Sequence, residues 1–432
     1  MALVFVLGYV FLRFAFLPEV LSTFFGFNTY SAPICGSLAL LTSFLMGDNA
    51  RFTRSKVSLL MVCFIGWIVV CTPMSISPEN SFDVIRTYFP IDMIMFFMIL
   101  STTLSVNDIK RLMMVIAVAG SLDLLIAYKV GYMEAGRYIL TFGSFRNPND
   151  LATHLLVCVP FCAMLGMQAK KAFIKPVTLV VCLGFLYIVL RTGSRAGLLS
   201  LLIIFVCVVL RASFTQRIIF LAVGGFAAMI AISRMPNDTF LRYANMFGIQ
   251  IQDEQLRGEV EGSTGARQQL FWDAVHISLE HPVFGVGPGN FPHADIDYAA
   301  SQGRRSAGQV AHNSYTETSS ETGFPGLVFF CSALFGSVFL ASSALSKTRK
   351  VPELREASNM AFALLLSLLA FCVLIFFVSM SYRFYAQVLV AMAVSFYLNV
   401  KEEIKRLAEA KAKQPGASYD STATGRAFPL RT

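Results

Sequence analysis

The feature that most constrains this chain is a series of apolar runs, many of them about 17 to 22 residues long, separated by polar turns. A helix of about 20 residues crosses the roughly 30 Å hydrocarbon core of a bilayer, so each such run is long enough to span it. Hydrophobic residues make up 56% of the 432 residues and charged residues only 14%, which excludes a soluble globular protein. The sequence therefore predicts an all-α, polytopic integral membrane protein.

The expected architecture has about twelve transmembrane helices and one long polar segment. The apolar runs lie near residues 3–23, 32–47, 57–73, 85–104, 111–130, 150–168, 173–190, 195–211, 217–233, 324–346, 357–379 and 383–400. They divide the chain into transmembrane helices 1–9 at 1–233, a polar segment at 234–323, transmembrane helices 10–12 at 324–400 and a tail at 401–432. The tail is expected to form a charged helix beside anionic lipid up to Lys413, followed by a disordered stretch at 414–432.

The distribution of lysine and arginine among the loops predicts the orientation of the chain. Basic clusters occupy alternate loops and the tail: Arg51, Arg54 and Lys56; Lys110 and Arg111; Lys170, Lys171 and Lys175; Arg211 and Arg217; Lys347, Arg349, Lys350 and Arg355; and 401–413. The positive-inside rule places these segments and both termini in the cytoplasm. The polar segment 234–323 is then outside, which in a bacterium is the periplasm. The net charge of +9 therefore follows membrane topology and does not indicate a nucleic-acid partner.

The predicted outer face carries twelve arginines but a single lysine, Lys129. A surface that needed only solvation would use both residue types. The planar guanidinium forms paired hydrogen bonds to phosphate or carboxylate, so this bias indicates a site for an anionic substrate. For any one of these arginines, a side chain that reaches to the lipid headgroups remains the alternative. The twelve are Arg86, Arg137, Arg146, Arg191, Arg195, Arg234, Arg242, Arg257, Arg267, Arg304, Arg305 and Arg383.

The turn 191–197, with the sequence RTGSRAG, joins two apolar runs on the outer face. Gly193 can end the first helix and Ser194 can cap the second, which puts Arg195 in the first helical turn. A cation there opposes the helix macrodipole by about 0.3–1 kcal/mol. An anion held by Arg191, Arg195 and the free N–H groups of the helix start would offset that cost. An ordinary loop with headgroup-facing arginines is the alternative.

The stretch 309–326 places a histidine, His312, immediately before a predicted helix start. Ser314 and Glu317 have the spacing of a capping box, Gly323 is expected to end the helix, and Pro325 suits the first turn of the next. The positive end of a helix favours neutral imidazole, so His312 is expected to be a proton acceptor. Its neighbours also suit substrate contacts, namely Asn313, Tyr315, Glu317 and Glu321. A structural role for the histidine stays open.

Two further segments of the outer face supply candidate substrate ligands. Asn149 or Asp150 can cap the sixth apolar run, and Arg146 and Asn147 can then reach the same anion as the turn 191–197. A helix is predicted over 265–281, with Arg267 in its first turn.

The helix 265–281 is followed by a glycine-rich turn, 285–291, which suits close backbone approach and offers Asn290 as a hydrogen-bonding group. This turn lacks the spacing and the strand–helix context of a dinucleotide fingerprint.

Four other groups of titratable residues are candidate polar sites. His293, Asp295 and Asp297 alternate as in a metal site, but a solvated loop is the favoured interpretation and no metal is expected. Within the apolar runs, Asp92 and Asp123 are candidate functional charges, with a pair to Arg86 as the equal alternative for Asp92, and His154 is expected to be a satisfied interior group.

Taken together, these motifs resemble the O-antigen ligase and polymerase family. The resemblance covers the turn 191–197, Arg267 with Trp272, the turn 285–291, the sequence HNSY at 312–315 and the sequence ETGFPG at 321–326. The segment 145–150 is similar to one that many members carry. The motifs span roughly residues 140–330 in the order of the family, and the set is specific although each motif alone is weak.

The resemblance implies an inverting, metal-independent glycosyltransferase of the membrane GT-C type, without a cofactor. Its donor would be a glycan on undecaprenyl pyrophosphate, and its acceptor a hydroxyl of the lipid A core in an O-antigen ligase of the bacterial inner membrane. The resemblance further implies that Arg191 and Arg267 bind the donor pyrophosphate with help from Arg195, and that His312 orients or deprotonates the acceptor. The active site would be periplasmic.

Three alternatives remain at this point. Members of the same family also polymerise glycan repeat units or transfer glycans to protein, and the shared motifs do not choose among acceptors. A transporter or flippase would represent another class of protein. Transport predicts charges along the membrane depth and helices broken at midplane, whereas the arginines here crowd one face. That arrangement favours an enzyme.

Overall fold

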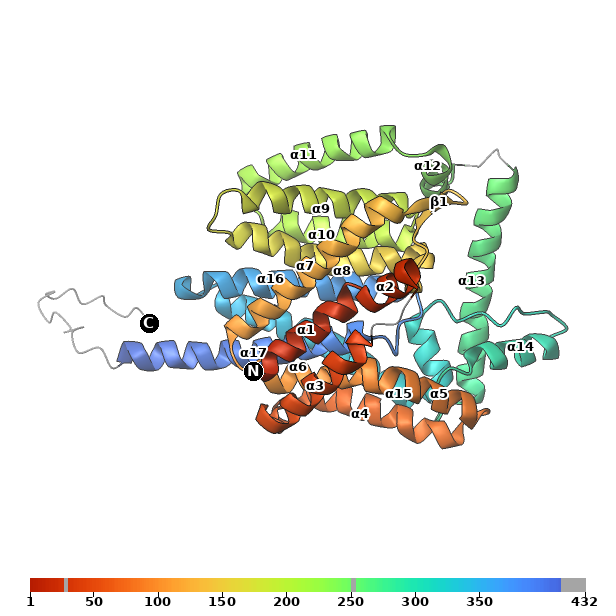
Figure 1. Cartoon of the computed structure of the whole chain (residues 1–432). Helices are drawn as coiled ribbons and strands as arrows, with labels where there is room; N and C mark the ends of the chain where they lie inside the picture. The colour runs from red at the N-terminus through yellow and green to blue at the C-terminus, as the bar shows by residue number, and fades with distance from the viewer. Residues whose placement is uncertain (27–29, 250–253, 413–432) are drawn as a thin grey trace, which may run out of the picture.

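The computed structural model describes residues 1–26, 30–249 and 254–412, and the chain there is almost entirely helical (Figure 1). Its two strands, β1 (Tyr132–Glu134) and β2 (Arg137–Ile139), form one short antiparallel hairpin, in which Tyr132 lies opposite Ile139. The helices are α1 (Ala2–Phe14), α2 (Leu17–Phe25), α3 (Ser31–Met46), α4 (Lys56–Cys71), α5 (Pro78–Tyr88), α6 (Ile94–Thr102), α7 (Val106–Val130), α8 (Pro148–Gln168), α9 (Ile174–Arg191), α10 (Arg195–Arg211), α11 (Phe214–Ser233), α12 (Asn237–Ala244), α13 (Glu254–Glu280), α14 (Phe291–Ser301), α15 (Ser314–Thr348), α16 (Arg355–Leu374) and α17 (Phe384–Ala412).

The predicted polytopic membrane fold is confirmed. Within the described residues, nine helical segments are long and apolar enough to cross a membrane by length and composition, or ten if the bent pair α1 and α2 is one span. That pair is bent by 53°. The two remaining predicted spans, 32–47 and 195–211, correspond to α3 and α10, which at 16 and 17 residues are slightly shorter than the nine segments, of which the shortest has 18 residues.

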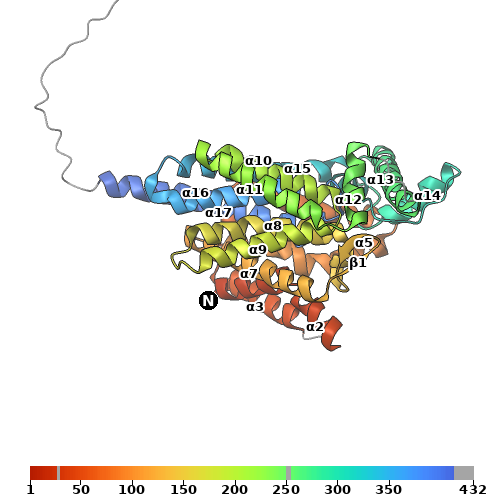
Figure 2. The ribbon, with the colours of Figure 1, turned by 90° about the horizontal axis from the view of Figure 1, so that it is seen from above.

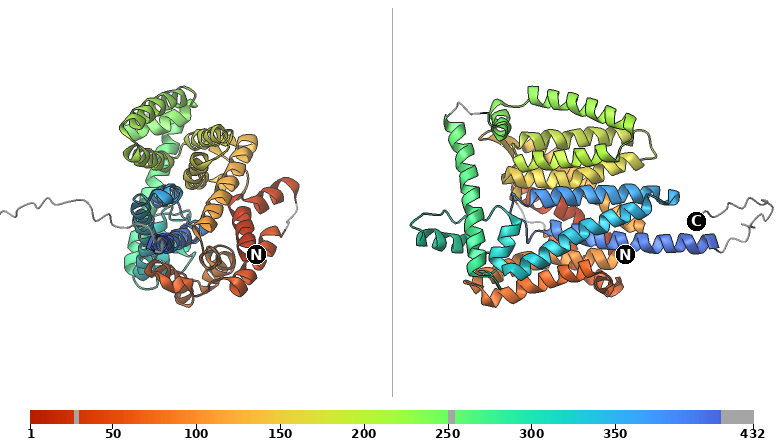
Figure 3. Two further views of the ribbon diagram at one scale, coloured as in Figure 1. Left: turned by 90° about the vertical axis from the view of Figure 1, so that its left-hand side faces the viewer. Right: turned by 180° about the vertical axis from the view of Figure 1, so that it is seen from behind.

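The spans run roughly parallel to one another, and α13 lies across their ends (Figures 1 and 3). Helix α14 lies on the outer side of α13, whereas the last turns of α17 project from the opposite end of the bundle (Figure 2). The predicted charged helix over 401–413 is the continuation of α17 as far as Ala412, and the stretch 414–432 falls outside the described residues. The polar segment thus gathers at one end of the bundle, called here the α13 end.

Two buried carboxylates inside the bundle, Asp92 and Asp123, are paired with basic side chains, as an environment without water favours. Asp92 accepts from the guanidinium of Arg13 at 3.1 Å, so its partner is Arg13 and not the alternative, Arg86. Arg13 lies in the last turn of α1, 79 residues from Asp92 in the chain, so sequence proximity could not indicate this pair. His154 is a satisfied interior group as predicted, because its Nε2 lies 2.9 Å from Asp123 and its Nδ1 lies 3.0 Å from the Tyr385 hydroxyl.

Helix α15 consists of two parts that meet at Gly323, whose φ of 68° and ψ of −179° are not helical. The segment 314–322 is polar and buried, and the longer segment after it is apolar. A Cβ at position 323 would lie 2.1 Å from the carbonyl oxygen of Val283, so only glycine fits. Pro325 falls in the first turn of the second part. The predicted break at Gly323 and Pro325 is confirmed.

Two helix caps differ from those predicted. Asn313 caps α15, since its Oδ1 accepts from the backbone N–H groups of Tyr315 (2.9 Å) and Thr316 (3.3 Å). The predicted capping box of Ser314 and Glu317 is therefore wrong, because the loop between α16 and α17 engages both side chains. Asn147 caps α8 by accepting from the N–H of Asn149 at 3.0 Å, which replaces the predicted cap at Asn149 or Asp150.

The helices of the polar segment also differ from expectation. Helix α13 begins eleven residues earlier than the predicted 265–281, so Arg267 lies in its middle and not in its first turn. The predicted loop around His293, Asp295 and Asp297 is the helix α14. Alternation along the sequence does not place side chains together on a helix, because its period is 3.6 residues.

Candidate active site

A cavity of about 460 Å³ lies at the α13 end, between α13 and the ends of the membrane helices. It is called here the arginine cavity. Its walls come from the β1–β2 hairpin, the starts of α8 and α10, α12, α13, the approach to α15 and the end of α16. The lining residues are Arg137, Asn149, Gly193, Arg195, Ala196, Arg242, Val260, Ser263, Thr264, Arg267, Gln268, Phe271, Ala311, His312, Asn313, Phe376 and Phe377.

Four of the lining residues are arginines, and none of the described lining residues is acidic. Arg195 donates to the Thr264 hydroxyl at 3.1 Å, and in the described part of the chain neither Arg195 nor Arg267 forms an ion pair. Burial, and then the positive charge of Arg195, lower the pKa of Arg267. Burial, and then the charges of Arg267 and Arg242, lower the pKa of Arg137 to about 9. The cavity is thus strongly cationic and suited to a multiply charged anion.

The turn 191–197 has the predicted local structure. Gly193 has a φ of 61°, and the Ser194 hydroxyl accepts from the N–H of Gly197 at 3.1 Å, which caps α10. Arg195 is consequently the first residue of α10 and points into the cavity wall formed with Thr264 of α13. A guanidinium and the free N–H groups of a helix start therefore meet at the same place.

His312 lines the arginine cavity from the segment just before α15. Its backbone φ of 52° lies in the left-handed region, a conformation that costs about 1–3 kcal/mol for a residue other than glycine. Burial, and then the positive charge of Arg267, lower the pKa of His312 to about 4. The imidazole is therefore neutral at pH 7 and can accept a proton or a hydrogen bond. The strained backbone aims it at the cavity while Asn313 caps α15.

Seven of the predicted site residues lie outside the arginine cavity, and three of these are Arg191, Arg146 and Asn147. The Arg191 guanidinium stacks on the rings of Tyr138 (5.1 Å) and Tyr187 (5.6 Å) and donates to the Tyr187 hydroxyl at 3.1 Å. Arg191 is not among the described residues that line the cavity, although it lies four residues before Arg195. Arg146 is exposed and donates to the carbonyl of Thr141 at 2.9 Å, while Asn147 caps α8.

Tyr315 and Glu317 hold α15 against the loop that joins α16 to α17. The Tyr315 hydroxyl donates to the carbonyl oxygen of Cys372 at 2.9 Å, and Glu317 accepts from the Ser381 hydroxyl at 2.7 Å. Of the predicted neighbours of His312, Asn313 lines the cavity.

Glu321 and Asn290 fix the glycine-rich turn 285–291 beside α15. Glu321 accepts from the N–H groups of Gly289 (2.8 Å) and Phe291 (3.1 Å) and from the Tyr382 hydroxyl (2.6 Å). Asn290 is buried and donates to the hydroxyls of Ser75 (2.7 Å) and Ser81 (2.8 Å). These side chains position the chain around the site and do not face the arginine cavity.

The turn 285–291 makes the close backbone approach that its composition predicts. A Cβ at Gly287 would lie 2.1 Å from the Ser75 hydroxyl oxygen, and one at Gly289 would lie 2.4 Å from Val84. Both glycines also have positive φ, 95° and 76°. The turn is therefore packed tightly between α5 and α15.

Sequence reasoning missed Arg137, Arg242 and Asn149 as lining residues. Arg137 donates to the Asn149 amide oxygen at 2.8 Å and to the carbonyl of Thr192 at 3.1 Å. Arg242 donates to the carbonyl of Ala135, in the turn of the β1–β2 hairpin, at 2.8 Å. The available signal was the excess of arginine on the predicted outer face, which includes Arg137 and Arg242 but does not single them out.

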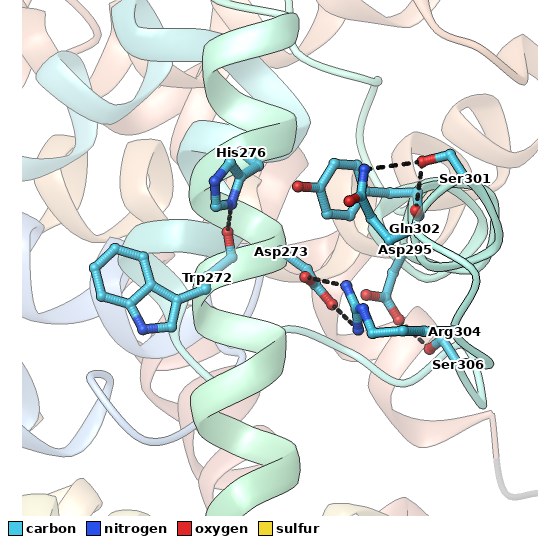
Figure 4. Close-up of polar contacts among 9 residues, drawn as sticks. Trp272, Asp273, His276, Asp295, Ser301, Gln302, Arg304 and Ser306 are labelled. Atoms are coloured by element: carbon cyan, nitrogen blue, oxygen red, sulfur yellow. Dashed lines mark hydrogen bonds and ion pairs between the residues drawn. The ribbon is translucent and has the colours of Figure 1, made fainter.

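The residues considered for a metal are separated in the structure. Asp295 is buried and accepts from the Ser306 hydroxyl, whereas His293 and Asp297 are exposed on α14 (Figure 4). Within residues 1–26, 30–249 and 254–412, no group of three or more His, Cys, Asp or Glu side chains could hold a metal ion.

Comparison with known proteins bears on the same stretch of chain. Residues 179–331 match the family model described as O-antigen ligase. A curated protein of Bacillus subtilis (strain 168), the teichuronic acid biosynthesis protein TuaE, is 30% identical over 162 residues, which are 36% of this chain. The match covers only 32% of that relative's length. The matched family region contains Arg195, Arg242, Arg267 and His312. The resemblance of this chain to the O-antigen ligase family is therefore confirmed over residues 179–331.

Proposed function

We propose that this protein is an inverting glycosyltransferase that moves a glycan from undecaprenyl pyrophosphate to an acceptor hydroxyl. The observation that carries the proposal is the joint presence of four arginines and a neutral histidine in one cavity. The O-antigen ligase match over residues 179–331 supports the same reaction class. The reaction would take place at the periplasmic face of a bacterial inner membrane, because the basic loop clusters favour cytoplasmic termini and an external α13 end.

In the proposed reaction the acceptor oxygen attacks the anomeric carbon of the donor from the side opposite the diphosphate. The bond from the acceptor oxygen to carbon forms while the bond from carbon to the diphosphate oxygen breaks, and its electron pair leaves with the diphosphate. Arg195 and Arg267 would bind that diphosphate and stabilise its growing charge. Arg137 of β2 and Arg242 of α12 add positive charge to the same cavity. The arginines supply this charge in place of a metal ion.

His312 would take the proton of the acceptor hydroxyl. Its low pKa in the free protein results partly from Arg267, so a bound diphosphate, which offsets that charge, would raise the pKa toward neutrality. The imidazole would thus become a stronger base only when the donor is present. The imidazole of the empty site therefore stays unprotonated, and donor binding makes it basic enough to take the proton of the acceptor hydroxyl.

The lipid A core is the leading candidate for the acceptor, because the family model that matches is the O-antigen ligase. A polymerase that extends the glycan itself is the second candidate. The relative TuaE favours it, since its name assigns it to teichuronic acid biosynthesis. Transfer to a protein hydroxyl is a further family alternative.

A flippase or other transporter, from a different class of protein, is less favoured. The cationic groups of the arginine cavity gather at the α13 end, whereas a transport path needs them along the membrane depth.

The direct test uses the purified protein with an undecaprenyl-pyrophosphate glycan. Lipid A core, free glycan and a serine-containing peptide are offered as acceptors in turn. Transfer to lipid A core supports a ligase, and elongation of the glycan supports a polymerase. The proposal fails if no acceptor receives glycan while the same preparation moves the donor across liposomes.

A further inference from the structure

A second, shallow cavity of about 380 Å³ lies on the face of α13 next to the arginine cavity. It is called here the Trp272 cavity, and it is lined by Gly265, Gln268, Gln269, Trp272, Asp273 and Arg304. Gln268 lines both cavities, so the two lie next to each other across α13. The proposed transfer reaction assigns no role to its residues.

The indole of Trp272 is 53% exposed, although tryptophan carries a large apolar surface. It projects from one side of α13, while Asp273 and Arg304 meet on the other (Figure 4). The second tryptophan of the chain, Trp67, is anchored, because its Nε1 donates to the carbonyl of Thr322 at 2.8 Å and its ring stacks on Phe284 at 5.5 Å. The Trp272 ring meets the Phe271 ring at 5.4 Å in an edge-on contact, and its nitrogen has no hydrogen-bond partner among the described residues, so Trp272 is the tryptophan with surface exposed to a ligand.

The opposite wall of the Trp272 cavity is polar and fixed. Arg304 donates to both carboxylate oxygens of Asp273, at 2.8 and 3.3 Å, and Asp273 is itself buried. With its oxygen turned toward Arg304, the Gln269 amide also accepts from that guanidinium. Arg304 remains partly exposed, with 34% of its side chain accessible. The guanidinium of Arg304, held by Asp273, and the carboxamides of Gln268 and Gln269 therefore line the same cavity as the exposed Trp272.

This combination matches the chemistry of a sugar ring. A pyranose presents an apolar face of C–H groups, which packs against an aromatic ring, and a rim of hydroxyls, which need fixed hydrogen-bonding partners. A lipid headgroup at an aromatic belt would contact the indole as well. It would not require the paired Asp273 and Arg304 or the two glutamines.

We propose that the Trp272 cavity binds a sugar residue of the glycan, beyond the sugar that reacts in the arginine cavity. This inference rests on the proposed glycan transfer, which it deepens by assigning a subsite for the chain. Trp272 stacks on the sugar ring, Gln268 and Gln269 on the same face of α13 hold its hydroxyls, and Arg304 positions Gln269. The length of glycan that reaches the subsite then contributes to donor or acceptor selection.

The test is a fluorescence titration of the full-length protein in lipid nanodiscs with lipid-free oligosaccharides released by mild acid from the host's surface polysaccharide. The chain has two tryptophans, and only Trp272 faces the subsite, so binding gives a saturable change in emission that Trp272→Phe removes. Arg304→Ala is expected to weaken binding on the order of tenfold. Gly265→Phe is expected to block it, because a Cβ at position 265 meets nothing within 4 Å and the ring would fill the cavity.

Leu279→Ala is the matched control, since Leu279 is 62% exposed on the same helix but does not line the subsite. Binding unchanged in Leu279→Ala and lost in Gly265→Phe supports the proposal. Absence of a saturable change with any oligosaccharide fraction overturns it. An emission change that appears with empty phosphatidylglycerol vesicles alone, and that Leu279→Ala weakens equally, also overturns it in favour of a membrane contact.

Arg267→Ala separates this inference from the proposed function. Lipid-free oligosaccharides carry no diphosphate, so their binding should survive in Arg267→Ala although transfer is lost. If transfer itself proves absent from the wild-type protein, the titration still decides whether the Trp272 cavity binds sugars. If transfer is present but Trp272→Ala lowers kcat/KM equally for single-sugar and full-length donors, the subsite assignment fails and the proposed function stands.

Discussion

At the scale of single residues, arginines that look alike in the sequence differ in whether they line the arginine cavity. Arg195 and Arg267 line the cavity without ion-pair partners among the described residues, whereas Arg191 rests on Tyr138 and Tyr187. Sequence resemblance assigns diphosphate binding to Arg191, whereas the cavity lining favours Arg195 for that role. Mutagenesis can decide between the two.

We expect Arg195→Ala and Arg267→Ala each to lower kcat about 100-fold or more, the usual effect of removing one group that stabilises leaving charge. Arg191→Ala should lower it less than about tenfold, because this side chain acts through its packing against Tyr138. Initial rates of glycan transfer, normalised to protein in the membrane, provide the measurement. A loss in Arg191→Ala as large as that in Arg267→Ala would restore Arg191 to the diphosphate site.

The pH dependence of transfer should reveal the coupling between His312 and the donor. The base must be neutral, so activity falls as pH decreases through its pKa. For the free protein, kcat/KM should therefore fall only near pH 4, the region of the lowered pKa of His312. For the donor complex, kcat should fall at a higher pH, because the bound diphosphate raises that pKa.

The two pH profiles are measured on the same preparation, with unfolding followed in parallel at each pH. An acid limb of kcat that lies at or below that of kcat/KM would contradict the coupling. His312→Gln keeps a hydrogen-bonding side chain but cannot take up the proton, so it should not transfer glycan at any pH. Its donor binding, measured over the same pH range, is the control that separates protonation of His312 from loss of the donor.

At the scale of elements, the site depends on a few segments that hold others in place. The turn 285–291 is clamped between α5 and α15 by Glu321 and Asn290, and the break at Gly323 lets α15 pass beneath it. These contacts fix the start of α15, and with it the strained His312.

Replacement of Gly287 by alanine should therefore destabilise the protein. The new Cβ would lie 2.1 Å from the Ser75 hydroxyl, and the φ of 95° is unfavourable for alanine. We expect a loss of at least about 1–3 kcal/mol and a lower midpoint in thermal unfolding of the purified protein. Gly265→Ala is the matched control and should be neutral or stabilising by up to about 1 kcal/mol, because that glycine lies within α13 in open space. Equal midpoints for the two variants would contradict the role of the turn.

Local sequence patterns predicted the features that depend on neighbouring residues. They failed where contacts with distant segments determine the role of a side chain. The cap at Ser194 and the break at Gly323 follow from residues within one turn of the chain, and both are confirmed. The cap at Ser314 was mispredicted because Val378 and Met380, more than sixty residues away, bind that hydroxyl. Arg137 and Arg242 could not be singled out for the same reason, since only the β1–β2 hairpin brings them to Arg267.

At the scale of the whole molecule, apolar runs determined the membrane fold, whereas the path of α13 had no signal in the sequence. Periodicity predicts that 265–281 is helical but not that the helix crosses the ends of the bundle (Figure 3). This crossing closes the arginine cavity over the turn 191–197 and carries Arg267 toward His312. The site is consequently a product of the tertiary fold.

The charge of the cavity leads to a prediction about metal ions. Because arginines supply the positive charge at the proposed diphosphate site, removal of divalent ions with a chelator should change the rate of transfer less than about twofold, well below the 100-fold scale of losing one charged group. The rate is measured in the purified system with excess EDTA and again after addition of magnesium or manganese. Loss of activity that a divalent ion restores would require a metal in the reaction.

The central claim is that one cavity divides the work between arginines that hold a diphosphate and a histidine that activates the acceptor. The most direct test measures donor binding and glycan transfer separately in His312→Gln and Arg267→Ala, with an undecaprenyl-pyrophosphate glycan and protein in nanodiscs. We predict that His312→Gln binds the donor like the wild type but does not transfer its glycan, and that Arg267→Ala binds the donor on the order of tenfold more weakly or worse. Wild-type donor binding by Arg267→Ala, or normal transfer by His312→Gln, would contradict the account.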